Sequence, residues 1–376
     1  GSTADPARNR PPVPMTDCII IGGGIIGMLT ARELSIGGAS VTLLEKGETA
    51  RESSWAGGGI LSPLYPWRYP DAVTLLARHS QEHYANVAGQ LHEDTGIDPE
   101  FIRSGLMIFN QEELETGLSW AARWEQNVEA VDATMASGLE PELAVPESRA
   151  LWFPEVAQVR NPRFTRALRA DIERRGVVIR TQTPVTALDF AGNRVTGVET
   201  PRGKIAADRI VVCAGAWTGE LLGRGTGSLD IEPVRGQMIL FHGAPGLVRH
   251  ITLFEGRYAI PRRDGRVLFG STMEHAGFDK KTTANAREDL YAHAVALLPA
   301  LRRLPIEHHW AGLRPGAPQG VPYIGVHPRA ENLFVNAGHF RNGVVLGLAS
   351  ARLGADLVLG REPILDPAPY AVDAAR

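Results

Sequence analysis

The sequence predicts an α/β protein that has a Rossmann-like domain and a second domain built on an antiparallel sheet. Three observations support this prediction. A glycine-rich turn joins a short apolar run to a helical segment near the N-terminus, and two later apolar runs end on small residues. Strand-like segments then follow one another without intervening helices between residues 234 and 271. A chain of 376 residues is long enough for two such domains.

The first element is a short strand that leads into a glycine-rich turn. Residues 18–21 have the length and apolar character of a buried parallel strand. Gly22, Gly24 and Gly27 then match the pattern G-x-G-x-x-G. In this pattern the first glycine forms the turn, the second admits a pyrophosphate to the backbone, and the third packs the helix against the strand.

A helix and a second strand complete this unit. The helix includes residues 28–34 and ends near Gly37 and Gly38, and residues 41–44 form the second strand, directly before Glu45. The helix N-terminus faces the phosphate charge, and an acid about 20 residues after the glycines accepts hydrogen bonds from a ribose diol. The unit therefore predicts a dinucleotide without a 2′-phosphate, but it does not separate NAD from FAD.

Further glycine-rich elements occur in three later parts of the chain. Ser53 and Ser54 precede a glycine cluster, which offers small residues and hydroxyls for a flat ring and a second phosphate. Strands at 210–213 and 333–338 end on small residues, and the second runs into the start of a helix. A helix N-terminus directed at the pyrimidine end of a flavin stabilises the negative charge of the reduced ring. This distribution fits a long cofactor within one domain better than a separate nicotinamide domain.

Composition and charge exclude several classes of protein. The formal net charge of −3 with mixed signs gives no basic field for nucleic acid. No apolar run approaches the roughly 18 residues that a membrane-spanning helix needs. Cys18 and Cys213 both lie in apolar strand segments, so no disulfide framework or cysteine metal site is expected, and a reducing cytoplasm is the expected compartment. The polar, proline-rich start has no signal-peptide core and reads as a tag before a native start near Met15.

The glycine-rich elements are separated by segments of different character. Residues 73–95 and 112–131 are expected to be helical, and residues 234–241, 258–261 and 267–271 are expected to form strands. The predicted boundaries place residues 16–65, 151–229 and 313–376 in a discontinuous cofactor domain and residues 66–150 and 230–312 in a substrate domain, after a tag or disordered stretch at 1–15.

Several motifs together resemble one known family, the D-amino-acid-oxidase-like FAD oxidoreductases. Within it the chain is most similar to the bacterial glycine oxidases of thiamine biosynthesis. The motifs occur in the order of that family and span nearly the whole chain; they lie at residues 20–45, 52–66, 234–241, 256–262, 310–316 and 338–343. The resemblance implies a Rossmann-like FAD-binding domain beside a substrate domain.

The resemblance also implies which residues contact FAD. They are Gly22, Gly24, Ile25, Ile26, Gly27, Glu45, Lys46, Ser53, Ser54, Ala56, Gly57, Gly58, Val185, Ala214, Gly215, Trp217, Arg314, His339, Arg341, Asn342, Gly343 and Val344. Sarcosine-oxidising relatives carry a flavin-bonding cysteine around 313–323, and this chain has none there. Noncovalent FAD is therefore expected.

Four residues are expected at the substrate. The resemblance places a carboxylate-binding arginine at Arg314, whose guanidinium offers two parallel donors; a solvated surface charge is the alternative. Tyr258 is expected to add a hydroxyl to the same carboxylate, unless it is a packed strand aromatic. Arg341 is expected to assist substrate or flavin, with a structural ion pair as the alternative. Met273 matches a pocket-lining position, although a plain core methionine fits equally well.

The expected reaction is oxidation of glycine and other small amines, such as sarcosine and small D-amino acids. Hydride transfer to flavin requires a neutral amine and a dry pocket but no general base, so His339 is expected to be structural. The family implies O₂ as oxidant, H₂O₂ and an imine as products, and a homo-oligomer, commonly a tetramer. No metal is expected, because His308 and His309 have no third ligand at useful spacing.

Three other functions remain open from the sequence. The nearest is an FAD-dependent D-amino-acid dehydrogenase that passes electrons to an acceptor other than oxygen. The others are an FAD-containing binding or assembly protein without turnover, and a dehydrogenase that uses a nicotinamide alone.

Overall fold

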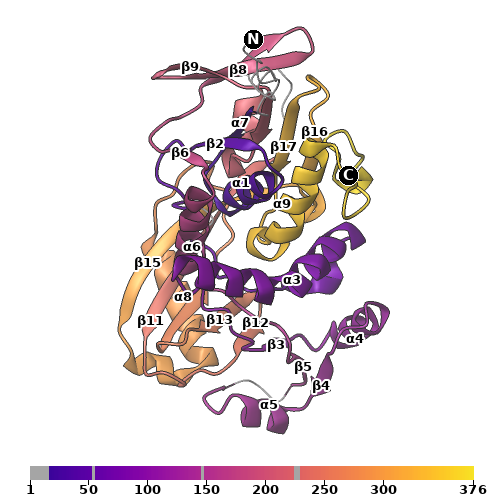
Figure 1. Ribbon diagram of the computed structural model, residues 1–376. Helices are drawn as coiled ribbons and strands as arrows, with labels where there is room; N and C mark the ends of the chain where they lie inside the picture. The colour runs from indigo at the N-terminus through magenta and orange to yellow at the C-terminus, as the bar shows by residue number, and fades with distance from the viewer. Residues whose placement is uncertain (1–16, 53–55, 145–147, 224–228) are drawn as a thin grey trace, which may run out of the picture.

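The computed structural model describes residues 17–52, 56–144, 148–223 and 229–376, and two sheets dominate it (Figure 1). The first has six strands in the order β16 (Tyr323–Val326), β17 (Leu333–Ala337), β10 (Arg209–Val212), β1 (Asp17–Ile21), β2 (Ser40–Leu44) and β6 (Val178–Arg180). All neighbouring pairs are parallel except β16 with β17. The predicted Rossmann-like sheet is therefore confirmed.

Successive side chains of β1, a central strand of this sheet, point to opposite faces, and each face is covered by other elements. Cys18 and Ile20 of β1 face a core formed with α1 (Ile25–Ile36), α3 (Asp71–Thr95), α6 (Asn161–Arg174) and α9 (Gly343–Leu359). Ile19 and Ile21 face the opposite side, where they pack with residues of α7 (Thr218–Gly223) and of a three-stranded sheet. That small sheet consists of β7 (Ala187–Ala191), β8 (Arg194–Thr200) and β9 (Gly203–Ala206).

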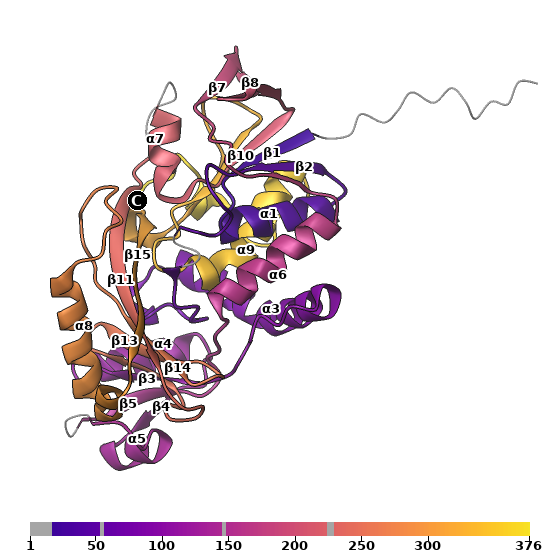
Figure 2. The same ribbon diagram turned by 90° about the vertical axis from the view of Figure 1, so that its left-hand side faces the viewer.

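The second large sheet has eight strands and is mainly antiparallel. Their order is β15 (Ile306–Gly316), β11 (Glu232–His242), β14 (Arg266–Gly270), β13 (Arg257–Pro261), β12 (Ile251–Phe254), β3 (Leu106–Phe109), β5 (Ala150–Phe153) and β4 (Glu129–Val131). Only β12 and β3 pair in parallel. Helix α8 (Ala284–Leu297) packs on one face of this sheet, as Figure 2 shows. The predicted antiparallel sheet is thus confirmed, and so is the predicted fold class.

The remaining helices are short. They are α4 (Leu114–Arg123), α5 (Ala133–Leu139) and the 3₁₀ turns Pro66–Arg68, Gly215–Trp217, Pro299–Arg303, Pro318–Gly320 and Ala368–Tyr370. None of the helices in the described ranges is long and apolar enough to cross a bilayer.

The segment 112–131 differs from the helix predicted there. Only the residues of α4 are helical, and the segment ends as strand β4, where Val131 pairs with Ala150 of β5. Glu125 has a φ of 52°, so the backbone leaves the helical conformation just after α4. Pairing with a neighbouring strand has overridden the helical pattern of the sequence.

Two of the predicted domain boundaries fall within strands of the eight-stranded sheet. The boundary between 150 and 151 lies in β5, and the boundary between 312 and 313 lies in β15. Strand β15 pairs with β11 from Ile306 to Gly316, so Arg314 belongs to the eight-stranded sheet. The assignment of whole ranges to a cofactor domain and a substrate domain stays a prediction.

Candidate active site

The turn between β1 and α1 requires glycine at two positions. Gly22 has a φ of +114°, and a Cβ atom there would lie 2.1 Å from the carbonyl oxygen of Cys213. A Cβ atom on Gly27 would lie 1.9 Å from the carbonyl oxygen of Gly22. The turn is therefore held against β10 on one side and α1 on the other. Gly24 is the N-cap of α1 and has no side chain to cap it, which leaves the helix N-terminus open to an anion.

Glu45 is directed back at this turn. Its carboxylate is buried, with one oxygen accepting from the amide of Gly23 at 3.1 Å and the other from the amide of Gly47 at 2.5 Å. Two charge-assisted bonds fix the side chain beside the glycines. The neighbouring Lys46 lies 2.8 Å from the ring centroid of Trp217, and burial lowers its pKa to about 8.

One cavity joins this turn to the eight-stranded sheet. Of the residues predicted to contact FAD, those that line it are Gly22, Gly24, Ile25, Ile26, Glu45, Lys46, Ala56, Gly57, Gly58, Val185, Ala214, Gly215, Trp217, Arg314, His339, Arg341, Asn342, Gly343 and Val344. Gly27 lies behind the turn, against Gly22 and outside the cavity lining. Ser53 and Ser54 lie outside the described residues. The structure thus brings segments from four distant parts of the chain to one site.

The start of α9 presents polar atoms that have no partner within the described protein. Neither ring nitrogen of His339 has a hydrogen-bond partner there, and nor has the Nδ2 atom of Asn342, although both side chains are buried. Both residues line the cavity at the N-terminal end of the helix, where the macrodipole is positive. Buried polar atoms are ordinarily paired, so this end of the cavity fits a polar ligand such as a flavin ring.

The inner face of the eight-stranded sheet forms the other end of the cavity. Side chains alternate across a strand, and in β11 the even positions Gly236 and Met238 line the cavity. Tyr258 of β13 and Arg314 of β15 line it as well. A Cβ atom on Gly236 would lie 2.1 Å from Nη2 of Arg314, so glycine at this position makes room for the guanidinium.

Arg314 is oriented by the segment that follows β14. Its Nη1 donates to the carbonyl oxygen of Thr272 at 3.1 Å, and its Nη2 donates to the hydroxyl of Ser271 at 2.6 Å. Burial and then the nearby Arg341 lower the pKa of Arg314 to about 10, so it stays cationic at neutral pH. Among the described residues, neither arginine forms an ion pair. Two unpaired cations at one cavity fit an anionic ligand.

A polar cluster on the other face of β11 holds the segment 271–274 in place. The buried Gln237 donates from Nε2 to the carboxylate of Glu274, and its backbone amide donates to the hydroxyl of Thr272 at 2.9 Å. Arg235 pairs with Glu274 at 3.0 Å. Gly236, Ser271 and Gln237 were not predicted from the sequence, because their contacts to Arg314 or to its support cross between strands.

Met273 differs from its prediction. It is absent from the cavity lining, and its side chain is 52% exposed. The residue lies beyond the end of β14, whose last residue is Gly270, so the sheet does not enclose it. The methionine that lines the cavity is Met238 of β11, not Met273.

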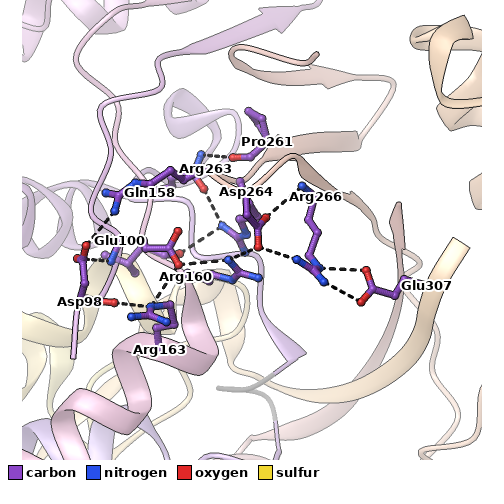
Figure 3. Close-up of polar contacts among 12 residues, drawn as sticks. Asp98, Glu100, Gln158, Arg160, Arg163, Pro261, Arg263, Asp264, Arg266 and Glu307 are labelled. Carbon is purple, nitrogen blue, oxygen red and sulfur yellow. Dashed lines mark hydrogen bonds and ion pairs between the residues drawn. The ribbon is translucent and has the colours of Figure 1, made fainter. Parts of the chain in front are cut away.

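A second polar network supports the glycine loop that lines the cavity. Figure 3 shows the part of this network around Gln158, Arg160 and Asp264. Arg262, also buried, donates to the carbonyl oxygen of Gly58 at 3.0 Å and to the side-chain oxygen of Gln158 at 2.7 Å. Nearby, Arg160 bonds the carboxylates of Glu100 at 3.2 Å and Asp264 at 2.9 Å. These contacts join the loop, the start of α6 and the β13–β14 hairpin, and they fix the position of the loop relative to the eight-stranded sheet.

Groups of three or more metal-ligating side chains are absent from the described part of the chain. Cys213 lines the cavity as a free thiol, and burial raises its pKa to about 12. It is therefore protonated at neutral pH.

Comparisons with known proteins agree with this geometry. The family described as FAD dependent oxidoreductase (DAO) matches residues 17–357. Glycine oxidase of Pseudomonas aeruginosa is 49% identical over 354 residues, which cover 94% of this chain and 97% of that protein. The bifunctional protein ThiO/ThiG of Trichormus variabilis is 31% identical over 357 residues, 93% of this chain and 54% of that protein.

A solved structure extends the likeness to the fold. The crystal structure of glycine oxidase from Geobacillus kaustophilus superposes with a TM-score of 0.91 at 29% identity, covering 96% of this chain and 99% of that one. The predicted resemblance and the predicted FAD cofactor are confirmed. The chain belongs to the FAD dependent oxidoreductase (DAO) family.

Proposed function

We propose that this protein is an FAD-dependent oxidase of glycine and other small amines. The observation that carries the proposal is the half-buried Arg314, which has no ion-pair partner among the described residues and faces the same cavity as the nucleotide turn. The relatives named glycine oxidase, similar over nearly the whole chain, support the same substrate class. An amino acid without a bulky side chain places a carboxylate within reach of such a cation.

The residues around the cavity fit FAD. The oriented carboxylate of Glu45 suits a ribose diol, and the open N-terminus of α1 suits a pyrophosphate. The unpartnered polar atoms of His339 and Asn342 suit the polar edge of a flavin. When bound, FAD supplies the acceptor for the hydride that leaves the α-carbon of the substrate. The protonated thiol of Cys213 and the absence of cysteine from residues 313–323 support noncovalent binding.

The side chains of the protein bind and orient the substrate. Arg314 offers its guanidinium to the carboxylate, and the buried Tyr258 offers its hydroxyl from the facing strand. This places the α-carbon in a site enclosed by protein, where fixed orientation lowers the barrier. Burial lowers the pKa of His339 to about 3, so at neutral pH its ring is uncharged, with one nitrogen protonated, and is not an imidazolium acid. Its role is to complete the polar wall of the cavity.

We also propose the wider setting of the reaction. Oxygen accepts the electrons and gives H₂O₂, and the imine product is released to hydrolysis or to thiazole assembly for thiamine. The relatives named ThiO/ThiG, in which a region like this chain is part of a longer protein, support that second fate. A cytoplasmic homo-oligomer, a tetramer by analogy with the family, completes the proposal.

An absorbance experiment tests the reaction directly. The purified protein should show flavin bands that bleach when glycine is added under argon and return when air is admitted. Bands that bleach with glycine but return only with an artificial electron acceptor would replace the oxidase by a dehydrogenase. Bands that no small amine bleaches would contradict the proposed function. The Arg314→Ala variant serves as the control, since it should retain the bands and respond only at much higher glycine concentration.

A further inference from the structure

We propose that Met238 limits the size of the group that a substrate carries on its α-carbon. The inference rests on the proposed function, because it assumes a ligand whose carboxylate is bound by Arg314 and Tyr258. It assigns selectivity to a residue of β11, on the eight-stranded sheet.

Met238 belongs to a cross-strand row of residues on the inner face of the sheet. In this row Trp310 of β15 pairs with Met238, Met238 pairs with Gly270 of β14, and Gly270 pairs with Tyr258 of β13. Gly270 contributes no side chain, so Met238 and Tyr258 meet across it. The Sδ atom of Met238 lies 3.9 Å from the hydroxyl oxygen of Tyr258. The thioether is therefore in contact with one of the two proposed carboxylate-binding groups.

The neighbouring glycines explain why the side chain of Met238 is confined. A Cβ atom on Gly270 would lie 3.0 Å from Cγ and 3.1 Å from Cε of Met238, so the methionine fills the space above that glycine. Two residues earlier on the same strand, the space above Gly236 is filled by the guanidinium of Arg314. Met238 is only 3% exposed and lines the cavity. It is thus packed against the sheet and borders the cavity.

The consequence is a size limit next to the carboxylate. A carboxylate that bonds Arg314 and the hydroxyl of Tyr258 brings its attached carbon over this row. Glycine has only hydrogens on that carbon, whereas a branched group meets the thioether. Methionine is flexible, so the limit is expected to rise gradually with size and to admit a methyl group more readily than an isobutyl group.

Binding of simple carboxylic acids tests this limit without turnover. Acetate, propionate and 4-methylpentanoate lack an amine and carry increasing bulk, and their dissociation constants are measured from the change in flavin absorbance of the FAD-loaded protein. In Met238→Ala, the affinity for 4-methylpentanoate relative to acetate should rise by about tenfold or more, as expected for methylene groups admitted to an apolar pocket. The Met238→Val variant, which suits a strand, should shift the ratio in the same direction by a smaller factor.

Leu268→Ala is the matched control. Leu268 is also 3% exposed and belongs to the same core cluster, but it does not line the cavity. Its truncation should leave the ratio unchanged. An unchanged ratio in both Met238 variants, or an equal rise in Leu268→Ala, would overturn the inference.

The same titrations separate this inference from the proposed function. If the acids bind in the expected order but no amine bleaches the flavin, the size limit stands and the proposed oxidation fails. If glycine bleaches the flavin but the ratio of acid affinities is the same in the Met238 variants as in the unsubstituted protein, the oxidation stands and the size limit fails.

Discussion

The two ends of the cavity are built in different ways. At the nucleotide turn, glycines bring the backbone and a helix N-terminus to the ligand, and Glu45 is held by two amides of neighbouring loops. On the eight-stranded sheet, long side chains from separate strands converge, and glycines serve to make room for them. The first end depends on local chain geometry, and the second depends on the register between strands.

The two ends of the cavity should respond to substitution independently. Glu45 follows strand β2 of the six-stranded sheet, whereas Arg314 belongs to the eight-stranded sheet, and the two share no hydrogen-bond partner among the described residues. Substitutions at the turn should therefore change cofactor affinity, and substitutions on the sheet should change substrate affinity. Three substitutions test this separation, and a fourth tests the polar end of the cavity at α9.

The largest effect is expected from Arg314→Ala. Removing one partner of a buried charge pair costs about 2–5 kcal/mol, so the KM for glycine should rise by roughly 10²-fold or more. FAD affinity should stay within about twofold if the two ends are independent. Steady-state oxidation and FAD titration measure the two quantities. An unchanged KM would remove Arg314 from the substrate site.

Glu45→Gln should act at the other end. Hydrogen bonds to charged groups contribute about 1.5–3 kcal/mol, so the Kd of FAD should rise roughly 10- to 100-fold while the KM for glycine at saturating FAD stays constant. Quenching of flavin fluorescence on titration measures this Kd. Glu48→Gln is the control, because Glu48 is an exposed neighbour that pairs with Arg169. Equal losses in both variants would point to a general charge effect.

His339→Leu tests whether the end of α9 is a fixed polar wall. Burial lowers the pKa of His339 from 6.5 to about 3, so between these values the unfolded chain binds the extra proton and the free energy of unfolding falls as the pH falls. From pH 6.5 to 5 the free energy of unfolding should fall by about 1.6 kcal/mol through this group, and in the variant it should fall by that much less. Urea unfolding at several pH values measures it. The exposed His308 provides the control variant His308→Leu, which should lose as much as the unsubstituted protein.

The smallest effect is expected from Ser271→Ala. This change removes the hydroxyl that accepts from Nη2 of Arg314 at 2.6 Å, and one such bond contributes about 1 kcal/mol. The KM for glycine should rise about fivefold, with kcat and FAD affinity unchanged. Ser271→Thr keeps the hydroxyl and should restore the KM. Failure of threonine to restore it would show that the hydroxyl is not what orients Arg314.

The sequence predicted the nucleotide turn well because that information is local. The strand, the glycines, α1, β2 and Glu45 follow one another within the chain, and each was expected where the structure has it. The arrangement of side chains on the eight-stranded sheet was harder to predict from the sequence. The space that Gly236 leaves for Arg314 and the bond from Arg314 to Ser271 join residues far apart in sequence, and no periodic pattern encodes the register between their strands.

Local patterns also failed where tertiary pairing decided the outcome. The charged segment 112–131 has a helical pattern, but its end joins β5 as a strand. Met273 follows a strand that ends at Gly270, so its sequence motif did not predict its exposure.

The most direct test of the separation between the two ends is a double-mutant cycle with Glu45→Gln and Arg314→Ala. Anaerobic flavin reduction by glycine is measured at saturating FAD in the unsubstituted protein, both single variants and the double variant. We predict that the two changes in free energy of glycine binding add within about 0.5 kcal/mol, as for distant sites without shared partners. A coupling of about 1 kcal/mol or more would contradict the account, because it would mean that the nucleotide turn and the substrate face act as one unit.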